Sequence, residues 1–380
     1  MNLLLLGGVG GVSLEASRDL FDRGGFDRIT LADADLEKAK MFAREIGLDS
    51  SCVTRVDAAN IAAVTSLMRG HDVALNGLPK AFAVTVLRAA IETKTDVVDL
   101  GSPTEDLESL DSEAGRAGIT YVAGCGATPG ITNMMARRAA EHLDSVEEIS
   151  VNFAAFRGFA LSPALIHTTL WEFDPAIKER AYFEDGVFHS VPPFSGERTV
   201  DFPQPIGSQP VFFVPHGETR TLPKNLKAKR VFTRGCFPPK IMKFLRAILD
   251  YGFYRTEPIQ IDGAKIGPRQ LLTEYLLQVP EGREEKIWGY GLHVEVAGKR
   301  SGQSVKHTLW TTHPNMEEWG IPGAYTKNVS MPLAVGVRLL IEGRQRGLGV
   351  GAPENMFPVE LFFSELEARG IKLHEKKNTG

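Results

Sequence analysis

Near its N-terminus the chain reads Leu3-Leu4-Leu5-Leu6-Gly7-Gly8-Val9-Gly10-Gly11-Val12-Ser13. A continuous apolar run that stops at glycines predicts a short strand buried on both faces of a parallel sheet. A helical pattern follows the glycines directly. Strand, glycine turn and helix in this order predict the first part of a βαβ unit.

Five more strand-like runs follow in the N-terminal third, and most are separated by segments long enough for a crossover helix. They are residues 29–32, 52–55, 73–75, 97–100 and 119–123. Asp35 is the expected N-cap of the second helix, and Gly47 is expected to end it. The alternation predicts an α/β fold with a doubly wound parallel sheet of the Rossmann type.

The turn Gly8-Val9-Gly10-Gly11-Val12-Ser13 matches the G-x-G-x-x-G dinucleotide pattern, with Ser13 in place of the third glycine. We expect Gly8 to permit the tight turn and Gly10 to let the backbone approach a pyrophosphate at the helix N-terminus. Gly11 and Val12 complete the expected cofactor loop. Because Gly7 and Gly11 are also glycines, the register is open by one residue.

Asp33 follows the second strand, at the spacing where a carboxylate accepts hydrogen bonds from the ribose hydroxyls of the cofactor. A carboxylate there repels the 2′-phosphate of NADP, and Asp35 adds to the negative charge. The sequence therefore predicts NAD as the cofactor, with NADP less favoured.

Two later strand ends should also face the cofactor, since ligands of such sheets lie beyond the carboxyl ends of the strands. Asn76 is expected to contact the ribose or nicotinamide, and Gly77 to allow close backbone approach. Asp99 ends the next strand. Simple turn chemistry is the alternative interpretation of Asn76 and Gly77.

Length and composition limit the other classes of function. A chain of 380 residues suggests two domains, and a net charge of -4 without a clustered basic patch argues against nucleic acid as a partner. No apolar run reaches the roughly 20 residues that span a bilayer. Cys52, Cys125 and Cys236 are odd in number and far apart, which argues against disulfides and favours a cytoplasmic protein.

The second half of the chain has a different pattern, typical of an α+β domain. Apolar residues alternate in residues 149–153 and 288–296, as in strands with one buried face. A turn at residues 298–302 is expected to join the second of these strands to another. Helices at residues 240–249 and 270–277 are expected to cover the sheet, and the polar tail from Glu375 onward is expected to be frayed.

From Gly124-Cys125-Gly126-Ala127-Thr128-Pro129-Gly130-Ile131-Thr132-Asn133 onward the sequence resembles the saccharopine dehydrogenase family, including its lysine 6-dehydrogenase branch. The resemblance also rests on Val97-Val98-Asp99-Leu100-Gly101, Asn328-Val329-Ser330-Met331-Pro332 and Gly351-Ala352-Pro353-Glu354, and it runs nearly end to end. It implies a Rossmann domain at residues 1–125, an α+β substrate and dimerisation domain at 126–325, closing helices at 326–380 that return to the Rossmann domain, and a homodimer.

The activity implied by the resemblance is NAD(P)-dependent hydride transfer at a carbon that bears nitrogen in an amino-acid substrate such as saccharopine or lysine. One alternative is reductive condensation of an amino acid or polyamine with an aldehyde, as in enzymes of the saccharopine reductase or carboxyspermidine dehydrogenase type. A catalytically silent NAD-binding sensor is the alternative outside enzymes, because a binding fold does not prove catalysis.

Such a reaction needs a group that exchanges a proton with the nitrogen and a cation that holds the substrate carboxylate. His216, Asp99 and Lys240 are the candidate acid–base residues; His216 stands in His216-Gly217-Glu218-Thr219, where the resemblance also places a histidine. Arg157 is the candidate carboxylate clamp. Cys125 lies in the Pro-Gly turn and is expected to line the substrate pocket.

His293 and Glu295 share one face of a predicted strand. Two ligands without a third do not form a metal site, so the sequence predicts none.

Overall fold

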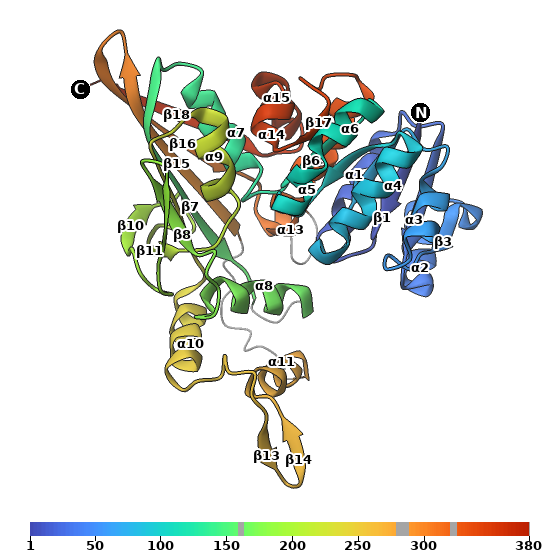
Figure 1. Cartoon of the computed structure of the whole chain (residues 1–380), viewed down its shortest axis with the longest axis horizontal. Coiled ribbons are helices and arrows are strands. Elements are labelled where there is room, and N and C mark those ends of the chain that lie inside the picture. The colour runs from blue at the N-terminus through green and yellow to red at the C-terminus, as the bar shows by residue number, and fades with distance from the viewer. Residues whose placement is uncertain (159–162, 279–288, 320–324, 380) are drawn as a thin grey trace. The chain divides into compact units, whose positions relative to one another are not determined.

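The computed structural model describes residues 1–158, 163–278, 289–319 and 325–379, and it divides into two compact units. Unit 1 consists of Met1–His142 and Thr326–Leu373, and unit 2 of Leu143–Tyr325 and His374–Gly380 (Figure 1). The first boundary falls later than the one expected after residue 125. The reason is that α7 (Ile131–Ala140) packs against α14 (Pro353–Met356) and α15 (Val359–Glu367) of unit 1.

Unit 1 contains a seven-stranded parallel sheet in the order β17-β6-β5-β4-β1-β2-β3. Its strands are β1 (Asn2–Leu6), β2 (Arg28–Asp33), β3 (Val53–Arg55), β4 (Val73–Asn76), β5 (Asp96–Asp99), β6 (Thr120–Ala123) and β17 (Gly349–Gly351). The doubly wound sheet and its six expected strands are confirmed. β17 was not among the expected strands, because its sequence carries no apolar run.

Both faces of this sheet are covered, which explains the unbroken apolar sequence of β1. Leu4 and Leu6 join one core cluster with Val64 and Leu87, whereas Leu5 points to the other face, toward Gly8. The helices between the strands are α1 (Ser13–Arg23), α2 (Leu36–Ile46), α3 (Ile61–Met68), α4 (Ala83–Thr93), α5 (Glu105–Ser109) and α6 (Asp111–Ala117), with short 3₁₀ turns at η1 (Ser50–Cys52) and η2 (Lys80–Phe82).

The ends of α2 follow local sequence rules, as expected. The Asp35 carboxylate accepts a hydrogen bond from Lys38 N at 3.0 Å, and Gly47 ends the helix in the left-handed conformation. The C-terminal stretch of unit 1 begins with α13 (Tyr325–Ile341) and continues through β17, α14 and α15.

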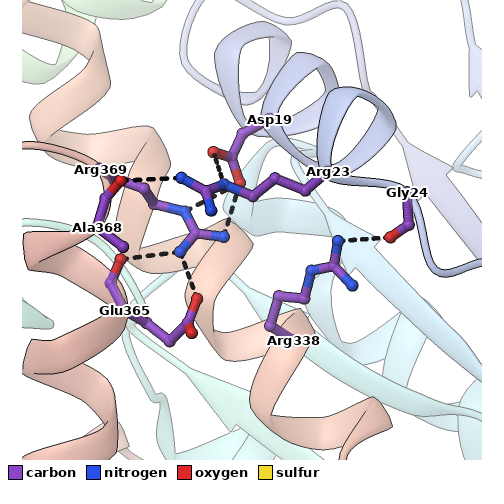
Figure 2. A network of polar contacts seen from close by, with 7 residues as sticks. All are labelled: Asp19, Arg23, Gly24, Arg338, Glu365, Ala368 and Arg369. Atoms are coloured by element: carbon purple, nitrogen blue, oxygen red, sulfur yellow. Dashed lines mark hydrogen bonds and ion pairs between the residues drawn. The ribbon is translucent and has the colours of Figure 1, made fainter.

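A polar network fastens this C-terminal stretch to α1 (Figure 2). Asp19 accepts from Arg369 Nε at 2.9 Å and from Arg23 Nε at 2.9 Å, and Arg338 donates to the carbonyl of Gly24. The Arg369 side chain is 1% exposed, so its charge depends on Asp19 and Glu365 for compensation. The network therefore stabilises the association of two stretches that are far apart in the sequence.

Unit 2 contains a mixed nine-stranded sheet whose main path is β10-β11-β12-β7-β15-β16-β18, with the β8–β9 hairpin on β12. Its strands are β7 (Ser145–Phe156), β8 (Ala181–Glu184), β9 (Val187–Ser190), β10 (Arg198–Asp201), β11 (Ser208–Phe213), β12 (Arg230–Cys236), β15 (Gly289–Arg300), β16 (Gln303–Thr312) and β18 (Lys372–Thr379). The expected turn joins β15 to β16. Trp288, expected in this strand, lies outside the described residues.

The helices of unit 2 are α8 (Pro163–Phe173), α9 (Glu218–Leu226), α10 (Pro239–Asp250), α11 (Pro268–Gln278) and α12 (Met316–Trp319). Met242 of α10 packs on a cluster of buried sheet residues, as expected. In contrast, α11 packs on α8, and Arg269 bonds Asp174 at 2.6 Å. The hairpin of β13 (Ile259–Ile261) and β14 (Ala264–Ile266) projects from the unit (Figure 1).

The expectation of a frayed tail was wrong. The tail forms the edge strand β18, in which the His374 ring stacks on Trp310 with centroids 5.6 Å apart. Glu375 accepts a hydrogen bond at 2.6 Å from the ring of His307, which is almost fully buried. Polar contacts hold this strand, so its sequence lacks the apolar alternation by which strands are recognised.

Candidate active site

The glycine loop after β1 makes the tight turn that a dinucleotide-binding loop needs. The left-handed conformation falls at Gly7 (φ 64°), one residue before the position expected from the sequence, and Gly10 N donates to Gly7 O at 3.0 Å. Gly8 is required for a different reason: a Cβ there would lie 2.6 Å from Leu31 Cδ1. The turn and close-packing roles are thus divided between two neighbouring glycines.

Ser13 takes the place of the third glycine because Gly77 leaves room for it. A Cβ on Gly77 would lie 2.5 Å from the Ser13 Cβ, and a Cβ on Gly10 would lie 2.9 Å from Ser13 Oγ. Ser13 Oγ also donates to the carbonyl of Gly7. The end of β4 therefore packs directly on the loop. The backbone of Gly77 makes a close approach, as expected, but the atoms that it approaches are those of Ser13 and Gly7.

The loop fits a pyrophosphate. Gly11 and Val12 lead into α1, whose N-cap Val12 provides no side-chain hydrogen bond to the first turn. Backbone N–H groups at an uncapped helix N-terminus are donors for an anion, and the helix dipole favours negative charge there.

Asp33 ends β2 beside this loop. Its Oδ2 accepts from Val9 N at 3.4 Å and its Oδ1 from Asp35 N at 3.1 Å. Arg55 is its register partner on β3. A cavity of about 510 Å³ at this strand end is lined by Ala34, Asp35, Leu36, Glu37 and Arg55. Asp33 therefore stabilises the glycine loop through Val9 N. The adjoining cavity is lined by carboxylates and one guanidinium.

Asp99 lies in a buried polar cluster that joins the carboxyl ends of β4 and β5 to Tyr121 of β6. Its Oδ2 accepts from Asn76 Nδ2 at 2.9 Å and from the hydroxyl of Tyr121, and its Oδ1 accepts from Gly101 N at 2.7 Å. Burial raises the pKa of Asp99 to about 6, although these three hydrogen bonds oppose the rise. Asn76 and Asp99 are thus paired with each other, and both are almost fully buried.

Cys125 is fully buried, and its thiol donates to the carbonyl of Pro332 at 3.1 Å. Burial raises the pKa of this thiol well above its usual range. A protonated, covered thiol is a packing group rather than a nucleophile.

In unit 2, one face of α8 connects His216 with Arg157. His216 Nε2 lies 3.4 Å from Glu172 Oε1, and the His216 ring stacks on Phe153 with centroids 4.9 Å apart. One turn earlier on α8, Thr169 Oγ1 accepts from Arg157 Nη2 at 2.6 Å. The fold therefore brings an imidazole, a carboxylate and a guanidinium to the same helix, although they are distant in the sequence.

The C-terminal end of α8, next to this group, is held by a buried arginine. Arg180 is fully buried and donates to the main-chain carbonyls of Glu172, at 3.1 Å, and Asp174, at 2.8 Å. These bonds hold the C-terminal end of α8, where carbonyl groups have no helical partner. Lys240 has a different setting: it is exposed on the first turn of α10.

His293 and Glu295 have other partners than a metal. Glu295 forms ion pairs with Arg198 at 2.5 Å and Lys306 at 2.7 Å. Within the described residues, no three histidine, cysteine or acidic side chains converge as metal ligands do. Among the same residues, no helix is both long and apolar enough to cross a bilayer.

Sequence reasoning missed two residues of these clusters. Tyr121 is fully buried in β6, and a tyrosine in such a strand needs a partner for its hydroxyl, which was a usable signal. Glu172 is 3% exposed and lies between Trp171 and Phe173. A carboxylate among apolar helix residues is a weaker signal, since the sequence does not reveal its partner.

Comparison with known proteins agrees with this architecture. Residues 3–122 match the family model of the saccharopine dehydrogenase NADP binding domain, and residues 126–371 match that of the saccharopine dehydrogenase C-terminal domain. A carboxyaminopropylagmatine dehydrogenase from Synechocystis sp. is 24% identical over 98% of this chain and 96% of its own. A carboxynorspermidine synthase from Vibrio alginolyticus is 25% identical over 86% of this chain and 82% of its own.

A similar fold has been solved. The apo saccharopine dehydrogenase (L-Glu forming) from Saccharomyces cerevisiae superposes with a TM-score of 0.74 and 19% identity, and the match covers 99% of each chain. The family models together span nearly the whole sequence and both structural units. The chain therefore belongs to the saccharopine dehydrogenase family of NAD(P)-linked oxidoreductases.

Proposed function

We propose that the chain transfers a hydride between a nicotinamide dinucleotide and a substrate carbon that bears nitrogen, in a substrate that is part amino acid. The observation that carries the proposal is the α8 group of unit 2, in which His216, Glu172 and Arg157 are held together. An imidazole and a guanidinium are the residue types that can accept a proton and bind a carboxylate, and such a substrate requires both.

In the oxidative direction the C–H bond is lost as hydride and the N–H bond as a proton, leaving an imine that water cleaves to a carbonyl compound and an amine. The dinucleotide, when bound, supplies the hydride acceptor. We propose that His216 takes the amine proton, that Glu172 stabilises the resulting imidazolium, and that Arg157 binds the substrate carboxylate. Gly10, Gly11 and Val12 would hold the pyrophosphate.

The other predicted acid–base residues have less suitable settings. Asp99 already accepts three hydrogen bonds, so we propose that it positions Asn76 of β4 and Tyr121 of β6 near the cofactor. Lys240 is exposed and has no carboxylate partner among the described residues. We assign Cys125 a packing role in the same region.

Reductive condensation of an amine with an aldehyde is the second candidate, and it is the same reaction in reverse. It is supported by the relatives named carboxyaminopropylagmatine dehydrogenase and carboxynorspermidine synthase, whose names describe a carboxylated amino-acid fragment joined to a polyamine. The buried carboxylate of Glu172 suits a cationic amine chain of this kind, whereas that of Asp174 is already paired with Arg269.

For the cofactor we propose NADP first and NAD second, which reverses the expectation from Asp33. The matched family domain is named for NADP, as is the yeast relative saccharopine dehydrogenase [NADP(+), L-glutamate-forming]. In this chain Arg55 is the group placed to pair a 2′-phosphate, because it stands opposite Asp33 at the strand end. The carboxylates of Asp35 and Glu37 oppose that phosphate and keep NAD as the second candidate.

The experiment follows absorbance of the reduced cofactor at saturating NADP or NAD, with saccharopine, lysine, carboxynorspermidine and carboxyaminopropylagmatine as substrates. Turnover on one of them supports the proposal. Arg55→Gln should lower kcat/KM with NADP about tenfold and leave the value with NAD nearly unchanged, because one charge-assisted contact is removed. Cofactor binding with no turnover on any substrate would favour the sensor alternative.

We also propose a cytoplasmic homodimer. The three cysteines are free thiols, which suits a reducing compartment, and the dimer is carried over from the family resemblance. Light scattering during size-exclusion chromatography checks the dimer: a mass of one chain would contradict it.

A further inference from the structure

A second cavity of unit 1, which we call the basic groove, lies on one face of the sheet between β2, β3 and α3. It has a volume of about 550 Å³, within the range of small-molecule sites. Three arginines, a histidine and hydroxyl side chains dominate its polar lining, and no acidic residue lines it: Arg28, Arg55, Arg69, His71, Thr30 and Thr54.

The groove interrupts what is otherwise an apolar sheet face. In β2, Ala32 belongs to the buried core cluster that includes Leu4 and Leu6. Thr30 and Arg28 point to the same face as Ala32, because side chains alternate along a strand. Two positions that would extend the core are therefore polar, although a purely structural role would favour apolar residues there.

His71 holds the Arg28 guanidinium at the groove without neutralising it. Arg28 Nη2 lies 3.4 Å from His71 Nε2, and His71 Nε2 in turn lies 2.9 Å from Thr30 Oγ1. The His71 side chain is 7% exposed, and burial together with Arg28 lowers its pKa. A neutral imidazole orients the arginine and leaves its positive charge in place.

The positive charge of the groove is largely unbalanced. Within the part of the chain that the structure describes, neither Arg28 nor Arg55 forms an ion pair. Arg69 pairs with Glu92 at 2.5 Å, but both side chains are more than half exposed, so water screens the pair. Like charges gathered at one cavity repel one another, and an anion relieves that repulsion.

We propose that the basic groove is a binding site for a phosphate-bearing small molecule, separate from the glycine loop that holds the cofactor. Guanidinium groups and hydroxyls are the donors that match phosphate oxygens. Arg28 begins β2 whereas Asp33 ends it, so the two are about 16 Å apart along the strand at its usual rise per residue.

Arg55 lines both the basic groove and the cavity at the end of β2. An anion in the groove draws this guanidinium away from the place proposed for the 2′-phosphate of NADP. Occupation of the groove should therefore weaken NADP binding more than NAD binding, and by linkage NADP should weaken binding in the groove by the same factor. This coupling rests on the proposed cofactor site, whereas the anion site itself does not.

The test is calorimetric titration of the full chain with inorganic pyrophosphate, first without cofactor and then with the glycine loop saturated by NADH. We expect binding in both conditions, and about tenfold weaker binding in Arg28→Gln, which loses one charged contact. Arg44→Gln is the matched control, because it removes an exposed arginine from the same unit outside the groove. In the imidazole NMR spectrum the His71 signal should shift on titration in the wild type.

Two outcomes overturn the proposal. One is pyrophosphate binding that NADH abolishes and Arg28→Gln leaves unchanged, which assigns the anion to the glycine loop. The other is the absence of binding at millimolar pyrophosphate with no shift of the His71 signal. If pyrophosphate binds as expected but no dinucleotide does, the proposed function fails and the anion site stands.

Discussion

The glycine loop of unit 1 and the α8 group of unit 2 are built in opposite ways. The loop consists of contiguous residues, from Gly7 to Ser13, completed by Gly77, which directly follows the neighbouring strand β4. The α8 group unites Arg157, Glu172 and His216, which come from three separate segments. A site made of one segment carries its geometry in its local sequence, whereas a site made of several segments depends on the fold for every distance.

The largest effect is expected from His216→Asn, which removes the proposed proton acceptor of the α8 group. It should lower kcat by about 10²–10⁴-fold, the usual contribution of a general acid–base residue. Lys240→Gln is the control and should retain wild-type kcat; if the two variants behave alike, the assignment is wrong.

Asp99→Asn tests whether the buried cluster of unit 1 is structural. The pKa of Asp99 is about 6 in the folded chain and about 3.9 when unfolded, so the native state retains its proton longer. The free energy of unfolding should therefore fall by about 3 kcal/mol between pH 3 and pH 7, most steeply between pH 4 and pH 6, and level off above that. Urea unfolding across this window measures the loss.

In Asp99→Asn this part of the pH dependence should disappear, because the amide does not titrate in the window. If the free energy of unfolding of the variant still falls by the full amount across this pH range, other titrating groups cause the fall.

Gly10→Ala tests the loop itself. The added Cβ would lie 2.9 Å from Ser13 Oγ and 3.2 Å from Gly7 O. Relief of this crowding should cost about 2 kcal/mol, which corresponds to roughly thirtyfold weaker cofactor binding if the loop shifts. Fluorescence titration with NADPH measures the change. Gly115→Ala, where a Cβ has no neighbour within 4 Å, should bind as the wild type does.

The smallest effect is expected from Ser13→Ala. It removes the hydrogen bond from Ser13 Oγ to Gly7 O but keeps the Cβ that packs on Gly77. Stability should fall by about 1 kcal/mol, the usual net value of one hydrogen bond. Thermal unfolding with and without NADPH would detect it, and an unchanged melting temperature would show that the hydroxyl contributes nothing.

Much of unit 1 could be predicted from the sequence, because most of its strands contain apolar runs and helices such as α2 and α3 begin at capping residues. The strands that could not be predicted lacked those signals. β17 contains two glycines in three residues, and β18 is held at a sheet edge by His374 and Glu375 rather than by buried apolar side chains. Hydrophobic periodicity cannot report a strand whose stability comes from polar contacts.

For the candidate site, the types of residue could be predicted from the sequence, but their burial and their hydrogen-bond partners could not. Asp99 and Asn76 were expected near the cofactor, and the structure pairs them with each other through an unexpected third residue, Tyr121. His216 was selected from its local cluster, but its partner Glu172 became visible only with the fold. Partner choice and burial are properties of the packed chain, and they decide which titrating groups are available for chemistry.

Unit 1 is assembled from two stretches, Met1–His142 and Thr326–Leu373, with most of unit 2 made between them. On a ribosome, β6 emerges early and remains an edge with unpaired backbone groups until β17 has been synthesised. Likewise Asp19 lacks its partner Arg369 until 350 further residues have been synthesised. Domains usually fold in the order of their synthesis, but unit 1, although it is begun before unit 2, can be completed only after most of unit 2 has been synthesised.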